Sequence, residues 1–313
     1  MKSDKRKTLK KVWGVIIITI IIYIVVSFAI TKIVYDACFV RYDKEAVLTP
    51  ELQEMVAARK SITFESSKNT LAGYFYGNDE SKGLVVIAGG HNSIADDYLW
   101  QIKSFLDYGW QVFAFDGTGC GDSEGNSCVG FSQEVFDLRA ALQYVNSNYE
   151  YEELYIFGHS RGGYAACTVD ADKYNVAAIV SVSGLNSAME AVMEPAVQRT
   201  GFLAYGNYHF LWMYQSILFG ADVVNLSAEE ELDKSGVPAL IIQGSQDEIA
   251  PPDSGSIYSH REDITSDNVE YYICDVPGQN GHTDLMYDND GTANDVLMNI
   301  INQFYSKKTT VSN

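Results

Sequence analysis

The sequence predicts an α/β fold: a mostly parallel eight-stranded sheet with helices on both faces and an inserted helical cap, preceded by one transmembrane helix. Three observations predict it. Short apolar runs alternate with helical patterns from about residue 61 to 306. One of these runs ends in a GxSxG pentapeptide that opens a helix. An uncharged apolar stretch at residues 12–31 lies close to the N-terminus.

The first 31 residues have the charge pattern of a signal anchor. Residues 1–11 contain six lysines and arginines, and residues 12–31 are uncharged and rich in isoleucine and valine. Twenty helical residues span about 30 Å, the thickness of the hydrocarbon core. Basic residues before the span favour a cytoplasmic N-terminus, with the rest of the chain outside. We therefore expect a single-pass cell-membrane protein, and the lysine-rich N-terminus and sparse cysteines suit a bacterial one.

Two other interpretations of this segment stay open. A cleaved signal peptide has the same order of basic and apolar residues, but its apolar region is shorter and a cleavage site follows promptly. A lipoprotein would use a cysteine such as Cys38, but residues 35–37 do not form an apolar lipobox. Residues 32–60 are expected to be a polar juxtamembrane spacer, with a short helix that starts at Pro50.

Residues 61–306 are expected to form the main domain. Helical patterns such as residues 132–142 lie between the apolar runs and predict the crossovers of a parallel sheet. The sixth and seventh runs are separated by more chain than one crossover helix needs, so an inserted cap is expected at about residues 185–236. A tail, residues 307–313, follows. The expected strands are 62–65, 71–76, 84–88, 111–115, 154–157, 177–181, 239–243 and 271–274.

The pentapeptide Gly158-His159-Ser160-Arg161-Gly162 follows the strand at 154–157 and opens a helical stretch at 164–172. A sharp strand-to-helix turn exposes a serine oxygen to a base, and the flanking glycines let the backbone turn without a side chain in the way. A bare GxSxG also occurs by chance. The strand before it and the helix after it make Ser160 the candidate nucleophile.

Two later loops carry the candidate acid and base, in the order Ser, Asp, His. Asp247 follows the strand at 239–243, where side chains face the ligand crevice of an open α/β sheet. His282 lies in the glycine-rich loop after the last strand. We expect His282 to take the proton of Ser160, and Asp247 to fix the tautomer of His282 and stabilise its imidazolium form.

Other residues of the same types fit these roles less well. Asp253 lies too far beyond its strand, and Asp284 follows the base too closely to orient it. Of the other histidines, His159 lies inside the pentapeptide, His209 in the cap and His260 on a helical surface.

Four motifs in this order resemble the α/β-hydrolase superfamily of serine hydrolases, in its monoacylglycerol-lipase-like and serine-aminopeptidase-like branch. The resemblance covers about residues 60–306. The turn after the strand at 84–88 lies where relatives carry a His-Gly oxyanion turn, with Gly89 replacing the histidine, and residues 116–125 resemble the family's D-x-x-G-x-G-x-S-x-G loop. The resemblance implies an oxyanion hole made by the backbone NH groups of His91 and Arg161.

Composition limits the partners. Outside residues 1–11 the chain has 16 basic and 40 acidic side chains, a net charge of −24, so the domain repels nucleic acid and other polyanions. Five cysteines are too few to hold the domain together by disulfides, although pairing of Cys120 with Cys128 stays open. No cysteine or histidine cluster has metal-ligand spacing, so neither a metal nor another cofactor is expected.

The main hypothesis is a membrane-anchored serine hydrolase that cleaves a carboxylic ester with a hydrophobic acyl or alcohol moiety through an acyl-Ser160 intermediate. The apolar side chains of the cap favour such a substrate. The alternative enzyme is a serine peptidase or aminopeptidase, with Glu190 and Glu194 as candidate partners of a substrate ammonium. The alternative of another class is an inactive surface binding module. Expected partners are thus a small-molecule or peptide substrate and membrane lipid, and the oligomeric state stays open.

Overall fold

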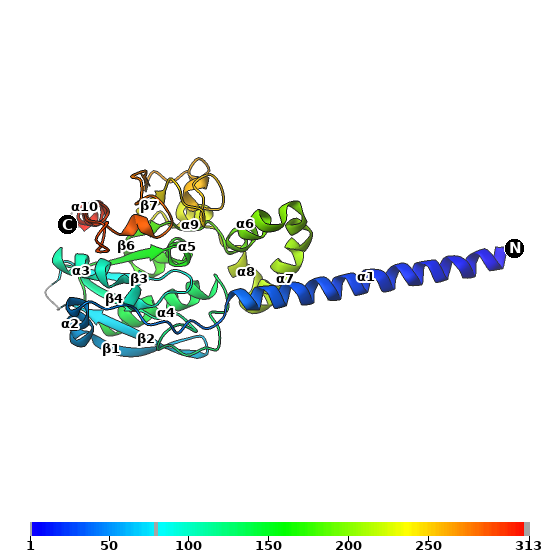
Figure 1. The fold of residues 1–313 in the computed structure, drawn as a ribbon, viewed down its shortest axis with the longest axis horizontal. Coiled ribbons are helices and arrows are strands. Elements are labelled where there is room, and N and C mark those ends of the chain that lie inside the picture. The colour runs from blue at the N-terminus through cyan, green and yellow to red at the C-terminus, as the bar shows by residue number, and fades with distance from the viewer. Residues whose placement is uncertain (1, 78–80, 310–313) are drawn as a thin grey trace.

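The computed structural model describes residues 2–77 and 81–309. It contains an eight-stranded sheet in the order β1-β2-β4-β3-β5-β6-β7-β8 (Figure 1). Strand β2 runs antiparallel to β1 and β4, and the other neighbouring pairs are parallel, which confirms the predicted sheet. The strands are β1 Lys60–Ser66, β2 Asn69–Tyr76, β3 Leu84–Ala88, β4 Gln111–Phe115, β5 Leu154–His159, β6 Val176–Val182, β7 Ala239–Gly244 and β8 Val269–Cys274.

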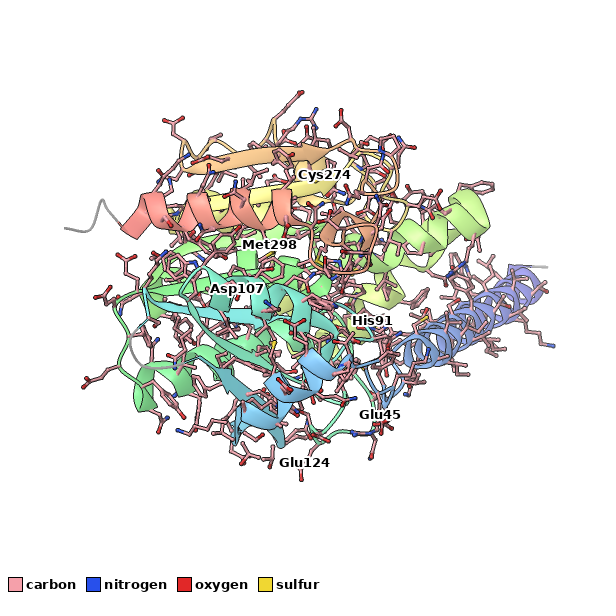
Figure 2. The ribbon with its side chains drawn as sticks, turned by 60° about the vertical axis from the view of Figure 1, so that its left-hand side comes forward. Glu45, His91, Asp107, Glu124, Cys274 and Met298 are labelled. Carbon is pink, nitrogen blue, oxygen red and sulfur yellow. The ribbon has the colours of Figure 1, made fainter. Side chains whose placement is uncertain are left out.

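Helices cover both faces of this sheet (Figure 2). Alternate residues of a strand point to opposite faces, and in β3 Val86 belongs to the buried cluster under α4 and α5, whereas Val85 and Ile87 belong to the cluster under α3 and α10. Figure 2 labels Met298 on α10 and Cys274 on β8, which lie at the same end of the sheet. The covering helices are α2 Pro50–Ala58, α3 Leu99–Asp107, α4 Gln133–Asn148, α5 Arg161–Thr168 and α10 Asp295–Thr309, with 3-10 turns at Ala95–Tyr98, Ala171–Tyr174, Ile257–His260 and Asp284–Met286.

The cap is inserted between β6 and β7, as predicted. Its helices α6 to α8 lie beside the base of α1 (Figure 1), and their side chains form a small hydrophobic cluster together with Tyr35 and Phe39. Helix α9 is different, because Ala228 and Leu232 pack into the main core rather than into the cap. The cap proper is therefore shorter than residues 185–236. Its elements are α6 Ala188–Thr200, η3 Gly201–Asn207, α7 Tyr208–Phe219 and α8 Ala221–Val224, followed by α9 Ala228–Ser235.

Helix α1 runs without interruption from Lys2 to Cys38, past the expected end of the apolar span at Thr31. Among the described residues, its segment Thr8–Cys38 is the one helix long and apolar enough to cross a membrane. Its first part extends away from the domain (Figure 1), whereas Tyr35 in its last turns and Phe39 just after it are buried against the cap, 2% and 3% exposed. The start of the expected spacer is thus helical and packed.

The chain ends fall partly outside the described residues. Met1 of the expected basic segment and residues 310–313 of the expected tail are not described. Helix α10 covers the beginning of that tail, because it continues to Thr309.

The packing of α4 on the sheet predicts how much a cavity between the two would destabilise the fold. Leu138 is fully buried on the sheet-facing side of α4. We expect Leu138→Ala to lower the free energy of unfolding by about 2–5 kcal/mol. The measurement is the apparent Tm of the full chain in detergent, with Gln143→Ala, an exposed position of the same helix, as the control. Equal Tm values for the two variants would contradict the assigned face of α4.

Candidate active site

Ser160 lies in the turn between β5 and α5, with φ of 55° and ψ of −115°. A positive φ is rare for a residue with a side chain and usually marks a functional site. Gly158 and Gly162 make this turn possible, because backbone atoms of other residues lie where a side chain at either position would be. A Cβ on Gly158 would lie 2.3 Å from the carbonyl oxygen of Gly162, and a Cβ on Gly162 would lie 2.0 Å from that of Ala88. The GxSxG spacing is thus a steric requirement of this turn.

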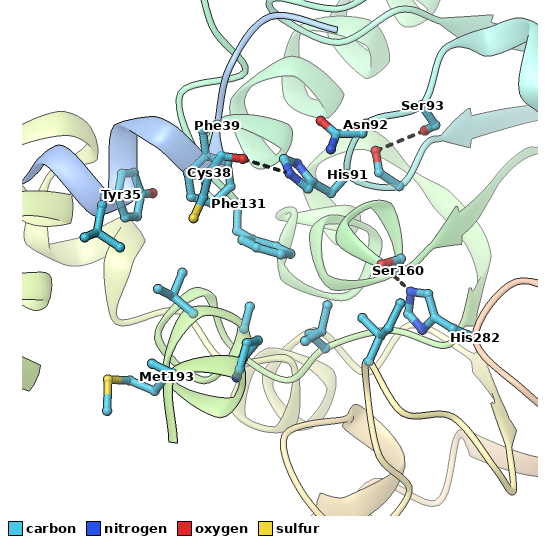
Figure 3. Close-up of a pocket in the computed structure, with 18 of the residues that line it drawn as sticks. Tyr35, Cys38, Phe39, His91, Asn92, Ser93, Phe131, Ser160, Met193 and His282 are labelled. Atoms are coloured by element: carbon cyan, nitrogen blue, oxygen red, sulfur yellow. Dashed lines mark hydrogen bonds between the residues drawn. The ribbon is translucent and has the colours of Figure 1, made fainter. Parts of the chain in front are cut away.

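The structure brings Ser160, His282 and Asp247 together at the carboxyl edge of the sheet. His282 Nε2 lies 2.8 Å from Ser160 Oγ (Figure 3). On the other side of the ring, Nδ1 lies 2.9 Å from Asp247 Oδ2 and 3.0 Å from Oδ1. Asp247 comes from the loop after β7 and His282 from the loop after β8, as the sequence predicted. The spacing is that of a nucleophile, a base and an orienting carboxylate.

The environment of Asp247 keeps its carboxylate ionised. Asp247 is 3% exposed and accepts hydrogen bonds from the backbone NH groups of Ile249 and Ala250, at 2.9 and 2.8 Å, and from Gln243 Nε2 at 2.9 Å. Burial acts to raise the pKa of Asp247, but the hydrogen bond from His282 and the two backbone donors outweigh burial and hold the pKa below its ordinary value. An ionised acceptor at Nδ1 leaves Nε2 of a neutral His282 free to accept the Ser160 proton.

A buried hydrogen-bond network connects the turn at Ser160 to its neighbours. His159 Nε2 lies 3.1 Å from the His282 carbonyl oxygen, so this nitrogen donates. His159 Nδ1 then accepts from the Tyr98 hydroxyl at 3.0 Å, and that hydroxyl accepts from the Gly90 NH at 2.7 Å. Burial, with a smaller contribution from His282, lowers the pKa of His159 to about 3, so the ring is neutral. Tyr98 carries no motif, and sequence analysis missed its role.

The two predicted oxyanion residues come from the start of α5 and from the turn after β3. Arg161 is the first residue of α5, and its buried guanidinium pairs with Glu134 at 2.7 Å. His91 lies in the turn after β3, and its Nε2 donates to the Cys38 carbonyl oxygen at 3.1 Å (Figure 3). Burial, with a smaller contribution from Arg161, lowers the pKa of His91 to about 4. The sequence motifs predict neither the contact of Arg161 with Glu134 nor that of His91 with Cys38, because each pair is distant in sequence.

The loop at residues 116–125 packs beside the oxyanion turn. Asp116 accepts hydrogen bonds from the backbone NH groups of Ala95 and Asp122, at 2.8 and 3.0 Å. The carboxylate therefore joins this loop to the segment that follows the turn of His91. Cys120 and Cys128 are buried free thiols in the structure, with their sulfurs 3.5 Å apart.

A cavity of about 970 Å³ opens from the serine. In Figure 3, Ser160 and His282 lie at one end of it, and Tyr35 and Met193 at the other. Most of the lining side chains are apolar, and many of these come from α1, from α6 and from Phe131. This size and composition are typical of a small-molecule site.

The carboxylates proposed to bind an ammonium do not line this cavity. Glu190 lies 3.3 Å from His260 Nε2, and Glu194 packs beside Gly255. Asp97, the acidic residue that does line the cavity, accepts a hydrogen bond from the Ile94 NH at 2.9 Å. The cavity wall thus offers little negative charge to a cationic group.

Comparison with known proteins agrees with this architecture. A family model described as serine aminopeptidase, S33, matches residues 79–213. An esterase of Pyrococcus furiosus is 17% identical and superposes with a TM-score of 0.65 over 86% of this chain and 99% of its own. An α/β hydrolase of Penicillium (15%, TM-score 0.60) and Est1E of Butyrivibrio proteoclasticus, solved with ferulic acid (17%, TM-score 0.59), each cover 80% of this chain and 99% of their own. Curated protein sequences gave no significant match.

The fold and the family match point to the same class of protein. The chain has the α/β-hydrolase fold, and its residues 79–213 match the serine aminopeptidase family model, in agreement with the resemblance. The matched family model supports hydrolase activity.

The neutral, buried His159 predicts a pH dependence of stability. An unfolded histidine has a pKa of about 6.5, whereas folding lowers that of His159 to about 3. Below pH 6.5 the unfolded chain therefore binds a proton that the folded chain does not, and we expect about 2 kcal/mol of stability to be lost between pH 7 and pH 5 from this residue.

This dependence is measured as the fall in apparent Tm between pH 7 and pH 5. The fall should be smaller in His159→Asn than in the wild type, and unchanged in His209→Asn, an exposed cap histidine. If the apparent Tm of His159→Asn falls between pH 7 and pH 5 as much as that of the wild type, the assignment of a neutral, buried His159 is refuted.

Proposed function

We propose that the protein is a membrane-anchored serine hydrolase that cleaves carboxylic esters with a hydrophobic acyl or alcohol moiety. The observation that carries the proposal is the continuous series of hydrogen bonds that links Ser160, His282 and Asp247. Its first residue, Ser160, lines an apolar cavity. The superfamily supports hydrolysis as the reaction class.

The proposed reaction proceeds in two steps. Ser160 Oγ attacks the ester carbonyl carbon while His282 Nε2 takes its proton, and His282 then protonates the departing alcohol. Water, deprotonated by His282, attacks the acyl-Ser160 ester and releases the carboxylic acid and the free serine. Asp247 stabilises the imidazolium formed in each step. The NH groups of His91 and Arg161 would hold the oxyanion, and loss of one such donor costs about 3 kcal/mol of transition-state stabilisation.

Two observations favour an ester over the alternatives. An aminopeptidase needs an anionic group near the substrate ammonium, and Glu190 is instead paired with His260 outside the cavity. An inactive binding module would have no need for the strained backbone at Ser160, a conformation that costs about 1–3 kcal/mol.

The exposed apolar surface of α1 supports membrane anchoring. Residues 15–18 and 20–26 of this helix are exposed aliphatic and tyrosine side chains, a surface too large and continuous for a monomer in water. The burial of Tyr35 and Phe39 in the cap cluster favours an anchor that is retained over a signal peptide that is removed. The basic N-terminal segment favours a cytoplasmic N-terminus and an extracellular catalytic domain.

Fluorophosphonate labelling of the full chain in detergent tests the proposed serine chemistry. We expect labelling of the wild type, none of Ser160→Ala and strongly reduced labelling of His282→Ala, because an unactivated serine is a poor nucleophile. His209→Ala should label normally. We also expect turnover of p-nitrophenyl esters rather than amino-acid anilides. If the folded wild type is not labelled, the proposal is contradicted. A preference for anilides would favour the peptidase.

The proposed role of Asp247 predicts that replacing its carboxylate by an amide of the same shape strongly lowers kcat. We expect Asp247→Asn to lower kcat by about three to four orders of magnitude, because the amide no longer fixes the His282 tautomer or stabilises its cation. The control is Asp253→Asn, an exposed aspartate of the same loop, which should keep kcat within about twofold. Similar kcat values for both variants would remove Asp247 from the site.

A further inference from the structure

The last turns of α1 are part of the wall of the active-site cavity. Ile30, Val34 and Tyr35 line it from this helix, and Phe39 lines it directly after the helix ends. Val34 and Tyr35 follow Ile30 by four and five residues, so the three side chains share one side of the helix and extend about 8 Å along its axis. The helix that carries the apolar N-terminal segment therefore also shapes the space next to Ser160.

Helix α1 is held in this place by contacts with the cap. The Tyr214 hydroxyl donates to Asp36 at 2.5 Å, and Asp36 also pairs with Lys32. The rings of Phe28 and Tyr214 pack edge to face, with centroids 5.9 Å apart. Charged and hydrogen-bonded groups at Lys32 and Asp36 place this level of α1 outside the hydrocarbon core. The pocket-lining turns thus lie where the helix would leave a membrane.

The end of α1 also contacts the proposed oxyanion turn. His91 Nε2 donates to the backbone carbonyl oxygen of Cys38, the last residue of α1. The rings of Phe39, His91 and Phe131 form a cluster (Figure 3). The ring centroid of Phe39 lies 5.1 Å from that of His91 and 5.7 Å from that of Phe131. A displacement of α1 would therefore reach both the cavity wall and the turn beside Ser160.

The cap presents an apolar surface on the same side as the free part of α1. Phe210 at the start of α7 contacts Tyr23, which lies within the apolar segment, with ring centroids 5.9 Å apart. Because Tyr23 lies within the expected span, this contact places the start of α7 beside the apolar segment. Among the cap side chains whose burial is described, the exposed large apolar residues are Phe202, Tyr205, Tyr208, Met213, Ile217 and Leu218.

We propose that the last turns of α1 form the acyl-chain wall of the active site, so that the substrate is a long-chain acyl ester that enters from the membrane holding α1. The proposal rests on the proposed serine hydrolase function. The acyl chain would extend from Ser160 past Phe131 and along Val34 and Ile30, while its apolar neighbours exclude water. Helix α1 would then be a specificity-determining element as well as an anchor.

The test compares two neighbouring tryptophan variants of α1 in the full chain. Val34 lines the cavity, whereas Ile33 is 68% exposed and does not line it. The full chain in detergent is assayed with p-nitrophenyl butyrate and p-nitrophenyl palmitate, and fluorophosphonate labelling measures the intact active serine in each preparation.

We expect the wild type to cleave both esters and Val34→Trp to lower the palmitate-to-butyrate ratio of kcat/KM by about tenfold or more. Ile33→Trp should keep the wild-type ratio of the two substrates. Ile30→Trp, one turn earlier on the lining face, provides a second test if Val34→Trp does not fold.

Three results would overturn the inference about α1: a wild type that cleaves butyrate but not palmitate, an unchanged ratio in both lining variants, or an equal change in Ile33→Trp. Each leaves the serine hydrolase intact provided that labelling persists. Absence of labelling in the wild type would instead overturn the proposed function and this inference with it.

Discussion

The backbone conformation at Ser160 is the constraint on which the rest of the site depends. A positive φ at the end of β5 points the hydroxyl out of the sheet, and it is possible only because Gly158 and Gly162 allow backbone atoms to approach where a side chain would collide. Parallel strands then bring the loops of Asp247 and His282 to the same edge of the sheet. The strain is thus compensated by the packing of the whole sheet, and the hydrogen bonds at the edge align the three polar groups.

Local features made most of this fold predictable. The strands β3 and β4 have the predicted bounds, because continuous apolar runs between turn residues are typical of buried parallel strands. Helix α5 ends at Thr168 rather than at residue 172, where the chain turns into a 3-10 segment. The three residues that meet at the proposed catalytic site carried recognisable motifs, whereas Tyr98 and Glu134 did not. Their partners are distant in sequence, so only the tertiary structure reveals them.

The extension of α1 to Cys38 is the largest departure from the sequence-based expectation. The sequence predicts a polar spacer from residue 32, but on a helix Lys32 and Asp36 are neighbours at i and i+4 and pair with each other, while Tyr35 faces the cap cluster. These contacts connect α1, the cap and the edge of the sheet that carries Ser160. In the proposed account, the same helix that holds the enzyme at the membrane also shapes its cavity and supports the turn of His91 through Cys38.

The most direct measurement of this account is a crystal structure of the full chain after reaction with a hexadecyl fluorophosphonate. The account predicts phosphorus bonded to Ser160 Oγ, its oxygen facing the NH groups of His91 and Arg161, and the alkyl chain lying between α1 and α6 beside Val34. An alkyl chain that leaves Ser160 by another path, away from α1, would contradict the role of this helix. Phosphorus bonded to any other residue would contradict the proposed catalytic site itself.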